Sequence, residues 1–208
     1  MKRKLTLDDL TLVESTHRYF LSGKELTSVT HALEAAGVTD FSKVPWEQLE
    51  RARLLGDYAH QIAMLYARQD LDESSLNPAL SGYLTAIKDF FHTRVSRVLL
   101  VEFKVYDLTM GYAGTGDVVY EDHRGRVCLD DYKKSQAIHP AARLQTAAYK
   151  RPIKKLYKID VHERGGVRIS DDGTWKRTPY TDQSDFPNFV HALELGRWKM
   201  KHGLAPAS

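Results

Sequence analysis

The chain has 208 residues, 42% of them apolar and 27% charged, with a formal net charge of +3. These values are ordinary for a soluble globular protein and predict one domain over residues 1–208 with a sizeable core. No apolar stretch approaches the length of a bilayer span, which excludes an integral membrane protein. The basic start lacks the apolar core and cleavage site of a signal peptide, so we expect a cytoplasmic location.

Cysteine is nearly absent, with Cys128 alone in the whole chain. One thiol cannot make an internal disulfide, a four-cysteine zinc site or an iron–sulphur cluster. Cys128 falls inside a predicted strand, where a free cysteine behaves as a small buried apolar residue. We therefore expect a structural side chain at this position and not a catalytic thiol.

The first 40 residues are predicted to form a leader segment that packs on the rest of the domain. Residues 10–24 have the turn residues of a short hairpin, at Ser15-Thr16 and Ser22-Gly23. Residues 28–36 predict a short helix, which Gly37 ends.

Two longer helices are predicted to follow the leader segment. Pro45 suits the first turn of a helix that runs to about Arg68, because proline has no N–H to satisfy there. Its buried stripe recurs at helical spacing: Leu49, Ala52, Leu55, Ala59, Ile62, Ala63 and Tyr66. Pro78 begins the next helix, whose apolar face is Leu80, Tyr83, Leu84, Ile87, Phe90 and Phe91.

The pattern then changes to three β-rich segments, at residues 98–106, 112–120 and 127–132. Turn residues between them predict a meander. Residues 139–153 return to a helical pattern, with Pro140 near the start.

The last part of the chain predicts strands at 156–161 and 167–170, then a helix from Asp185 to about His202. The inward-facing residues of that helix are predicted to be Phe186, Phe189, Val190, Leu193 and Trp198. This order of elements predicts an α/β fold with a mixed central sheet and helices on both faces.

Two aspartates are predicted to end neighbouring strands, Asp117 on one and Asp131 on the next. Lys133 lies two residues past Asp131, so its side chain leaves the same side of the strand, whereas Asp130 points away and is expected to be structural. Each aspartate alone is also common at a turn or strand end. Together they would repel each other unless a hard divalent cation such as Mg²⁺ or Mn²⁺ lay between them.

Basic residues gather in two stretches of the sequence. The first is Lys133, Lys134, Arg143, Lys150, Arg151, Lys154, Lys155 and Lys158, and the second is Arg197, Lys199, Lys201 and His202. A basic region beside a metal-type site suits a polyanionic substrate, and a solvated helix face is the alternative.

Short motifs occur in a set order on these predicted elements. They are G-x-x-x-H at 56–60, Glu102 in the first long strand, G-T-G-D at 114–117, D-Y-K at 131–133 and Q-x-x-x-Y at 145–149. Each is weak alone, but the ordered set resembles the PD-(D/E)XK nuclease superfamily in its RecB-like branch. That branch includes stand-alone phage exonucleases and the mitochondrial genome maintenance exonuclease. The leader segment H-R-Y-F-L-S-G-K-E-L-T-S-V-T is similar to that of such phage proteins.

The resemblance implies a restriction-endonuclease-like fold and a divalent metal site. Its ligands would be His60, Asp117, Asp131 and the backbone carbonyl of Tyr132, and its cation Mg²⁺ or Mn²⁺. The chain departs from the family in having Gly116, not proline, before the first aspartate. Taken alone, His60 could equally be a buried or capping histidine.

The remaining implied catalytic residues are Lys133 and Glu102. Lys133 would stabilise the phosphoryl oxygens and orient the attacking water, or else is a surface lysine. Glu102 would hold a second metal or Lys133.

The resemblance also implies residues that support the site and contact DNA. These are Gln145 and Tyr149, one turn apart on a helix, with Arg143 as a phosphate contact. For Tyr149, packing in the core is an equal alternative.

The function expected from the resemblance is that of a metal-dependent DNA exonuclease. It would act on single strands or duplex ends in phage or prophage recombination and repair, in a bacterial or phage-infected cytoplasm, with a possible recombination or single-strand-binding partner. A site-specific or structure-specific endonuclease of the same fold is one alternative. A non-catalytic nucleic-acid-binding module is the other.

Overall fold

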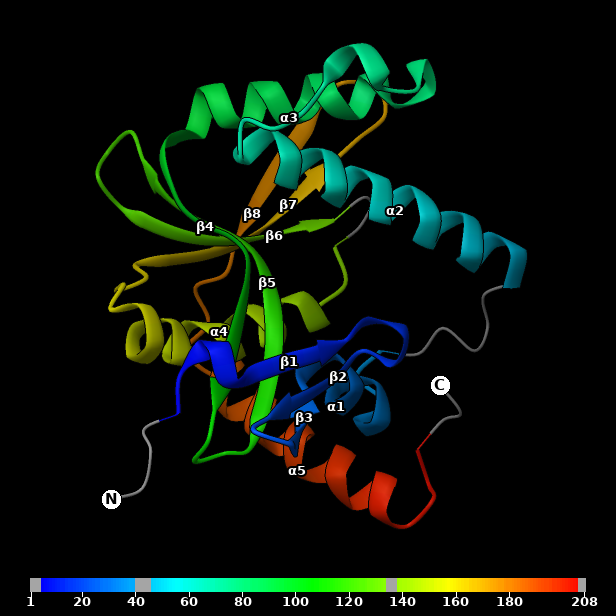
Figure 1. Cartoon of the computed structure of the whole chain (residues 1–208), viewed down its shortest axis with the longest axis vertical. Helices are drawn as coiled ribbons and strands as arrows, with labels where there is room; N and C mark the ends of the chain where they lie inside the picture. The colour runs from blue at the N-terminus through cyan, green and yellow to red at the C-terminus, as the bar shows by residue number, and fades with distance from the viewer. Residues whose placement is uncertain (1–4, 40–45, 134–137, 206–208) are drawn as a thin grey trace.

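The computed structural model describes residues 5–39, 46–133 and 138–205, and within 46–55 only the side chains of Trp46, Glu47 and Leu54. The central element is a mixed sheet of eight strands. Helices cover both of its faces, as the sequence predicts (Figure 1). Pro45 and Lys134, and the side chains of Leu49, Ala52 and Leu55, lie outside the described residues.

The leader segment contributes three strands to this sheet, where one hairpin was expected. Antiparallel β1 (Leu10–Val13), β2 (Arg18–Leu21) and β3 (Lys24–Ser28) are followed by α1 (Val29–Ala36), which ends at Gly37 with φ 85°. Strand β3 pairs in parallel with β5 (Tyr112–Asp122), and its Thr27 lies opposite Tyr112. The leader segment is therefore joined to the central sheet by backbone hydrogen bonds.

The two predicted longer helices pack on one face of the sheet. They are α2 (Trp46–Ala67) and α3 (Ser81–Arg94), and α3 is preceded by the short 3₁₀ helix η4 (Pro78–Leu80). The expected stripe of α2 is confirmed at Ala59, Ile62 and Ala63, which are buried against α3 and the sheet. Cys128 is buried in the same cluster and, as expected, is a free cysteine in the core.

The predicted meander is present as β4 (Val95–Asp107), β5 (Tyr112–Asp122) and β6 (Val127–Lys133). Successive side chains of β5 enter different cores because strand side chains alternate. Val118 packs with α2 and α3. Val119 packs on the other face with α1, α4 (Ala141–Tyr157) and α5 (Asp185–Lys201). This alternation places one apolar layer on each side of the sheet.

The C-terminal elements differ from the sequence prediction in three respects. The predicted strand 156–161 is wrong, because helix α4 (Ala141–Tyr157) includes its first two residues and residues 158–162 form no strand. Lys158 ends the helix with a left-handed backbone. Strand β7 (Glu163–Ile169) is followed by an unpredicted strand, β8 (Trp175–Pro179). The last helix, α5 (Asp185–Lys201), covers the same face as α1 and α4.

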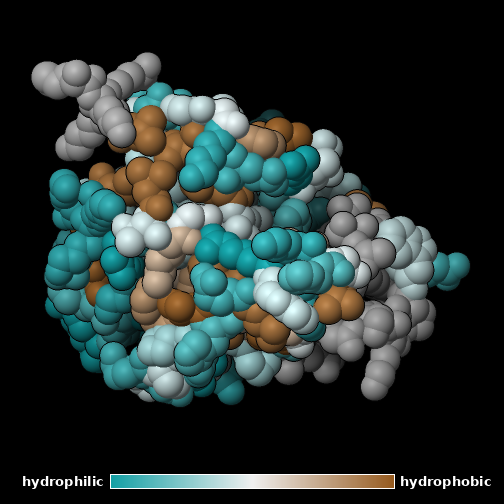
Figure 2. Space-filling model, turned by 90° about the horizontal axis from the view of Figure 1, so that it is seen from below, coloured by the Kyte–Doolittle hydropathy of each residue, from teal (hydrophilic) through white to brown (hydrophobic). Residues whose placement is uncertain are grey.

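The third difference concerns Trp198 of α5, which was expected to face inward and is instead 53% exposed. Helix α5 lies at the lower end of the molecule in Figure 1, and Figure 2 views the molecule from that end. Apolar residues on this face are broken up by hydrophilic ones.

In the described part of the chain, no helix combines the length and the apolar character needed to cross a bilayer.

The sheet forks at β5, and the fork positions the site. One edge of β5 pairs with β3 at Tyr112 and Ala113 and with β6 only from Val118 onward. The G-T-G-D segment, residues 114–117, lies between these two ladders. On this edge its backbone pairs with neither strand, which leaves room for side chains from other elements.

Candidate active site

A cleft of about 560 Å³ lies beside the fork. Helix α2, strands β4, β5 and β6, helix α4 and the leader segment all contribute to its walls. The polar and charged residues that line it are His17, Thr30, Asp57, His60, Gln61, Glu102, Thr115, Asp117, Asp131, Lys133 and Gln145. Several residues predicted for catalysis are therefore brought together by the fold.

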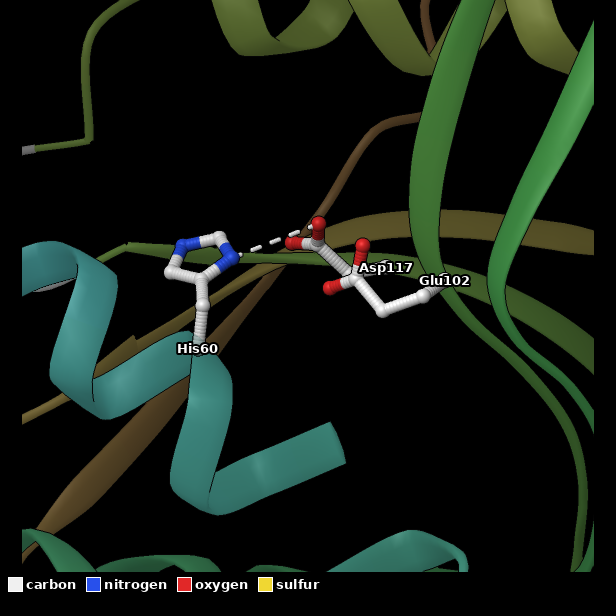
Figure 3. A group of neighbouring side chains, drawn as sticks. All are labelled: His60, Glu102 and Asp117. Carbon is white, nitrogen blue, oxygen red and sulfur yellow. Dashed lines mark ion pairs between the residues drawn. The ribbon is translucent and has the colours of Figure 1, made fainter. Parts of the chain in front are cut away.

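Three of these side chains converge on one point (Figure 3). His60, Glu102 and Asp117 each offer a ligand atom, and these atoms all lie within 4.8 Å of one another. His60 Nδ1 lies 3.4 Å from Asp117 Oδ1. His60 approaches from a helix, and the two acids come from neighbouring strands (Figure 3). The sequence predicted His60 and Asp117 as ligands, whereas Glu102 had been given a secondary role.

Glu102 reaches this point through an unusual backbone conformation. Val101 pairs with Val118 and Phe103 with Gly116, so Glu102 lies opposite Asp117 on the adjacent strand. The φ of Glu102 is 46°, in the left-handed region. That region costs a residue with a side chain roughly 1–2 kcal/mol, and such conformations are concentrated at functional sites.

Asp131 and Lys133 form an ion pair at the same cleft. Lys133 Nζ lies 2.8 Å from Asp131 Oδ2, as expected for side chains two residues apart on one strand. The Tyr132 N–H between them donates a 2.6 Å hydrogen bond to Asp117 Oδ2. Asp131 Oδ2 is buried, and within the described residues it accepts no hydrogen bond of good geometry. The Tyr132 carbonyl as a metal ligand stays a prediction.

Electrostatics at the cleft reflect an excess of carboxylates. Burial alone would lower the pKa of His60, but the Asp117 carboxylate outweighs it and raises that pKa to about 9. Burial would raise the pKa of Asp117, and the facing His60 instead holds it below its ordinary value. Burial, with Asp117 nearby, raises the pKa of Glu102 to about 7. Burial and Asp117 also raise the pKa of Asp131 to about 6, despite Lys133.

The donor set fits a divalent cation. Two carboxylates and one imidazole are ligands that Mn²⁺ accepts well, and Mg²⁺ accepts the carboxylates. Two ligands on opposite sides of such an ion lie roughly 4.2 Å apart. The present spacing, within 4.8 Å, therefore needs only small side-chain movements to enclose one ion. A cation there would also offset the carboxylate repulsion that raises the pKa of Glu102 and of Asp131.

Close packing requires glycine at both glycine positions of the G-T-G-D segment. A Cβ on Gly114 would lie 2.5 Å from Tyr149 Cε1, and one on Gly116 would lie 2.4 Å from Phe103 Cζ. Both aromatic rings therefore lie directly against the β5 backbone. This close packing fixes the strand that carries Asp117.

Of the three residues predicted to contact DNA, only one lines the cleft. Gln145 lines the cleft, and its Nε2 donates to Tyr149 Oη at 3.2 Å. Tyr149 is only 2% exposed, which agrees with the alternative of core packing. Arg143 does not line the cleft, and it makes ion pairs with Asp182 and Asp185. A phosphate contact by Arg143 stays a prediction.

Part of the predicted basic region lies away from the carboxylates. Lys150, Arg151, Lys154 and Lys155 line another hollow of about 750 Å³, which shares no lining residue with the cleft. At 100° of helical rotation per residue, Lys154 lies opposite Gln145 on α4, whereas Lys150 and Arg151 are turned well away from it. The expectation that this whole group lies beside the acids is therefore wrong for these four.

Five polar residues that line the cleft were not among the predicted site residues: His17, Thr30, Asp57, Gln61 and Thr115. Thr115 lies inside the G-T-G-D motif and could have been found there. His17 and Thr30 are more than 80 residues from Asp117 in the sequence, and only the likeness of the leader segment to phage proteins pointed toward them.

Comparisons with known proteins agree with the fold. No protein-family model matches the chain, and no curated protein matches it. A crystal structure of a Eubacterium rectale protein, named there as a "Putative exonuclease", matches with a TM-score of 0.51 and 12% identity. The match covers 86% of this chain and 82% of that one. A structure named SSO0001 matches at a TM-score of 0.40 and 14% identity, over 82% and 74% of the two chains. At such identities the first likeness concerns the fold alone.

Proposed function

We propose that this chain is a metal-dependent DNA exonuclease of the PD-(D/E)XK superfamily, in its RecB-like branch. The observation that carries the proposal is the convergence of His60, Glu102 and Asp117 on one point beside the Asp131–Lys133 ion pair. The fold likeness to a protein named as an exonuclease supports it. The nuclease domain would span residues 1–208, and DNA would be its substrate.

In this proposal His60, Glu102 and Asp117 hold a divalent cation, and Asp131, which lines the same cleft, would be a further ligand. When bound, the cation makes a water molecule more acidic and offsets phosphate charge. The Lys133 ammonium, held by Asp131, donates to a non-bridging phosphoryl oxygen and stabilises the charge that develops there. Gln145, which lies on helix α4, orients the bound DNA strand.

The overall reaction is hydrolysis of a phosphodiester bond. The water oxygen forms a bond to phosphorus as the bond to the 3′ oxygen breaks. The products then carry a 5′-phosphate and a 3′-hydroxyl, with one proton of the water on the 3′ oxygen. A role in phage or prophage recombination or repair, in a bacterial cytoplasm, belongs to the same proposal and rests on the family resemblance.

The test is a nuclease assay on end-labelled single-stranded and duplex DNA with Mg²⁺ or Mn²⁺. We expect nucleotides to be released from ends, EDTA to stop the reaction, Asp131→Ala to abolish it and Lys133→Ala to slow it by about 10²–10³-fold. Activity that survives EDTA, or that either substitution leaves unchanged, would refute the proposal. Cutting of a covalently closed circle would indicate an endonuclease instead, and binding without cleavage in every divalent ion would indicate a binding module.

A further inference from the structure

The leader segment forms one wall of the cleft. The short 3₁₀ helix η2 (Glu14–Thr16) connects β1 to β2, and His17 follows it directly. His17 and Thr30 line the same cleft as His60, Asp117 and Lys133. In Figure 1 the turn between β1 and β2 lies below α2, the helix that carries His60. Two histidines from distant parts of the chain therefore face one cleft.

The backbone holds His17 in a conformation that histidine seldom adopts. Its φ is 49°, in the left-handed region. In the described part of the chain, five residues other than glycine have a positive φ: His17, Ser22, Gln69, Glu102 and Lys158. Two of these five line the cleft, namely His17 and Glu102. Glycine or asparagine would adopt this turn at lower cost, so the turn alone does not explain an imidazole at this position.

A chain of polar contacts ties His17 to the strand that carries Asp117. Tyr19 is fully buried, and its Oη lies 2.9 Å from Thr115 Oγ1 and 3.4 Å from His17 Nε2. Thr115 precedes Asp117 by two residues on β5, so both side chains leave the same side of the strand. The imidazole is thus held at one nitrogen, with its position fixed relative to the acids.

In the described part of the chain, no residue hydrogen-bonds to the second nitrogen of His17, Nδ1, so this atom can bind a ligand. Burial, together with the nearby His31 ring, lowers the pKa of His17 and favours a neutral imidazole. A neutral imidazole has one donor and one acceptor nitrogen. In the tautomer whose Nε2 accepts from the Tyr19 hydroxyl, the proton lies on Nδ1, which can donate to an anionic oxygen.

We infer that His17 is a substrate-binding residue of this site, donating a hydrogen bond to a non-bridging phosphate oxygen of the bound strand. The inference rests on the proposed function, because the cleft beside the acids is where the phosphodiester would lie. The leader segment then forms part of the binding site and does more than cover the domain. Tyr19 acts as a positioning residue, since it reaches the substrate only through His17.

The first experiment measures binding of a labelled single-stranded oligonucleotide to the full chain, with Ca²⁺ in place of Mn²⁺. His17→Asn is the test variant, because asparagine tolerates a positive φ but is too short to reach the phosphate. A hydrogen bond to a charged group contributes about 1.5–3 kcal/mol, so we expect Kd to rise about tenfold or more. In Mn²⁺ assays KM should rise by a similar factor with little change in kcat. His17→Gln, which keeps a donor, should recover part of the affinity.

The matched control is His191→Ala, an exposed histidine on α5, which should bind as the unmodified protein does. An unchanged Kd in a folded His17→Asn would overturn the inference. If that variant does not fold, carbethoxylation of the unmodified protein decides the question. The oligonucleotide should protect His17 but not His191, and a His17 that reacts equally with and without it contradicts the inference.

These outcomes separate the two proposals. Cleavage by the unmodified protein together with unaltered binding by His17→Asn would remove the role of His17 alone. Binding that depends on His17, without cleavage in any divalent ion, would remove the nuclease activity and keep the phosphate contact. A protein that binds no oligonucleotide would overturn both.

Discussion

Asp130 and Asp131 are adjacent in β6, yet their carboxylates have opposite surroundings. Asp130 is fully buried and accepts hydrogen bonds from Tyr120 Oη at 2.7 Å and from Arg177 Nε at 2.7 Å. Asp131 faces the cleft and pairs with Lys133. Strand alternation separates the two side chains. One aspartate of the D-D-Y-K segment therefore stabilises the sheet, as expected for Asp130, and the other belongs to the candidate site.

Substitutions at these two positions should have opposite effects. Asp130→Asn removes one of the two carboxylates that pair with the buried Arg177 and leaves only Glu163, so it should lower the free energy of unfolding by about 1.5–3 kcal/mol. Asp131→Asn removes a carboxylate whose pKa is raised by burial and by Asp117, so stability should hold or rise while nuclease activity is lost. Urea unfolding and an Mn²⁺ nuclease assay measure both effects. An Asp131→Asn variant that cleaves DNA normally would contradict this assignment.

Lys133 should matter for the rate of reaction. Removing one group that stabilises developing charge typically lowers kcat by about 10²–10³-fold, so we expect that loss for Lys133→Ala. Lys176→Ala is the matched control, since Lys176 is an exposed lysine on strand β8. Single-turnover cleavage compares the two variants. Equal rates in both would mean that Lys133 has no part in catalysis.

Metal affinity should depend on pH through Glu102 and His60. Glu102 has a pKa of about 7 and His60 one of about 9, and each must lose its proton before it can bind a cation. Mn²⁺ affinity should therefore weaken as pH falls from about 8 to about 6, with protons released on binding. Calorimetry in buffers of different ionisation enthalpy measures both quantities.

Glu102→Gln tests the same site, since it should weaken Mn²⁺ binding and flatten part of this pH dependence. Glu121→Gln is the control, because Glu121 pairs with Arg97 on the surface and does not line the cleft. Mn²⁺ affinity that does not change with pH in the unmodified protein would argue against these ligands.

Gly116 and Gly56 should respond differently to alanine. A Cβ on Gly116 would clash with the Phe103 ring, so Gly116→Ala should cost about 1–3 kcal/mol and displace Asp117. A Cβ on Gly56 meets nothing within 4 Å, so Gly56→Ala should gain about 0.5–1 kcal/mol through helix propensity. Thermal unfolding checks both signs. A stable, active Gly116→Ala protein would show that the packing of Phe103 on β5 is dispensable.

The sequence predicted the elements whose signal is local. The stripe of Ala59, Ile62 and Ala63 and the meander of β4 to β6 follow from short-range periodicity. Strand β8 was missed because its W-K-R-T-P sequence is polar, and its Arg177 pairs with Asp130 and Glu163, which lie on other strands.

The site shows the same division between local and long-range signals. The positions of Asp131 and Lys133 on one side of β6 could be predicted from a spacing of two. The place of Glu102 beside Asp117 depends on strand register and a left-handed backbone, which no local pattern indicates. His17 reaches the cleft only because β3 pairs with β5. Such long-range strand pairings determine the positions of the site residues that could not be predicted from the sequence.

The most direct test of the metal centre is an anomalous difference map from a crystal soaked in Mn²⁺. We predict one strong peak in contact with His60 Nδ1 and with carboxylate oxygens of Asp117 and Glu102, close to the Asp131 carboxylate. A map in which Mn²⁺ binds elsewhere, or leaves these three side chains without a peak, would contradict a nuclease metal centre in this cleft.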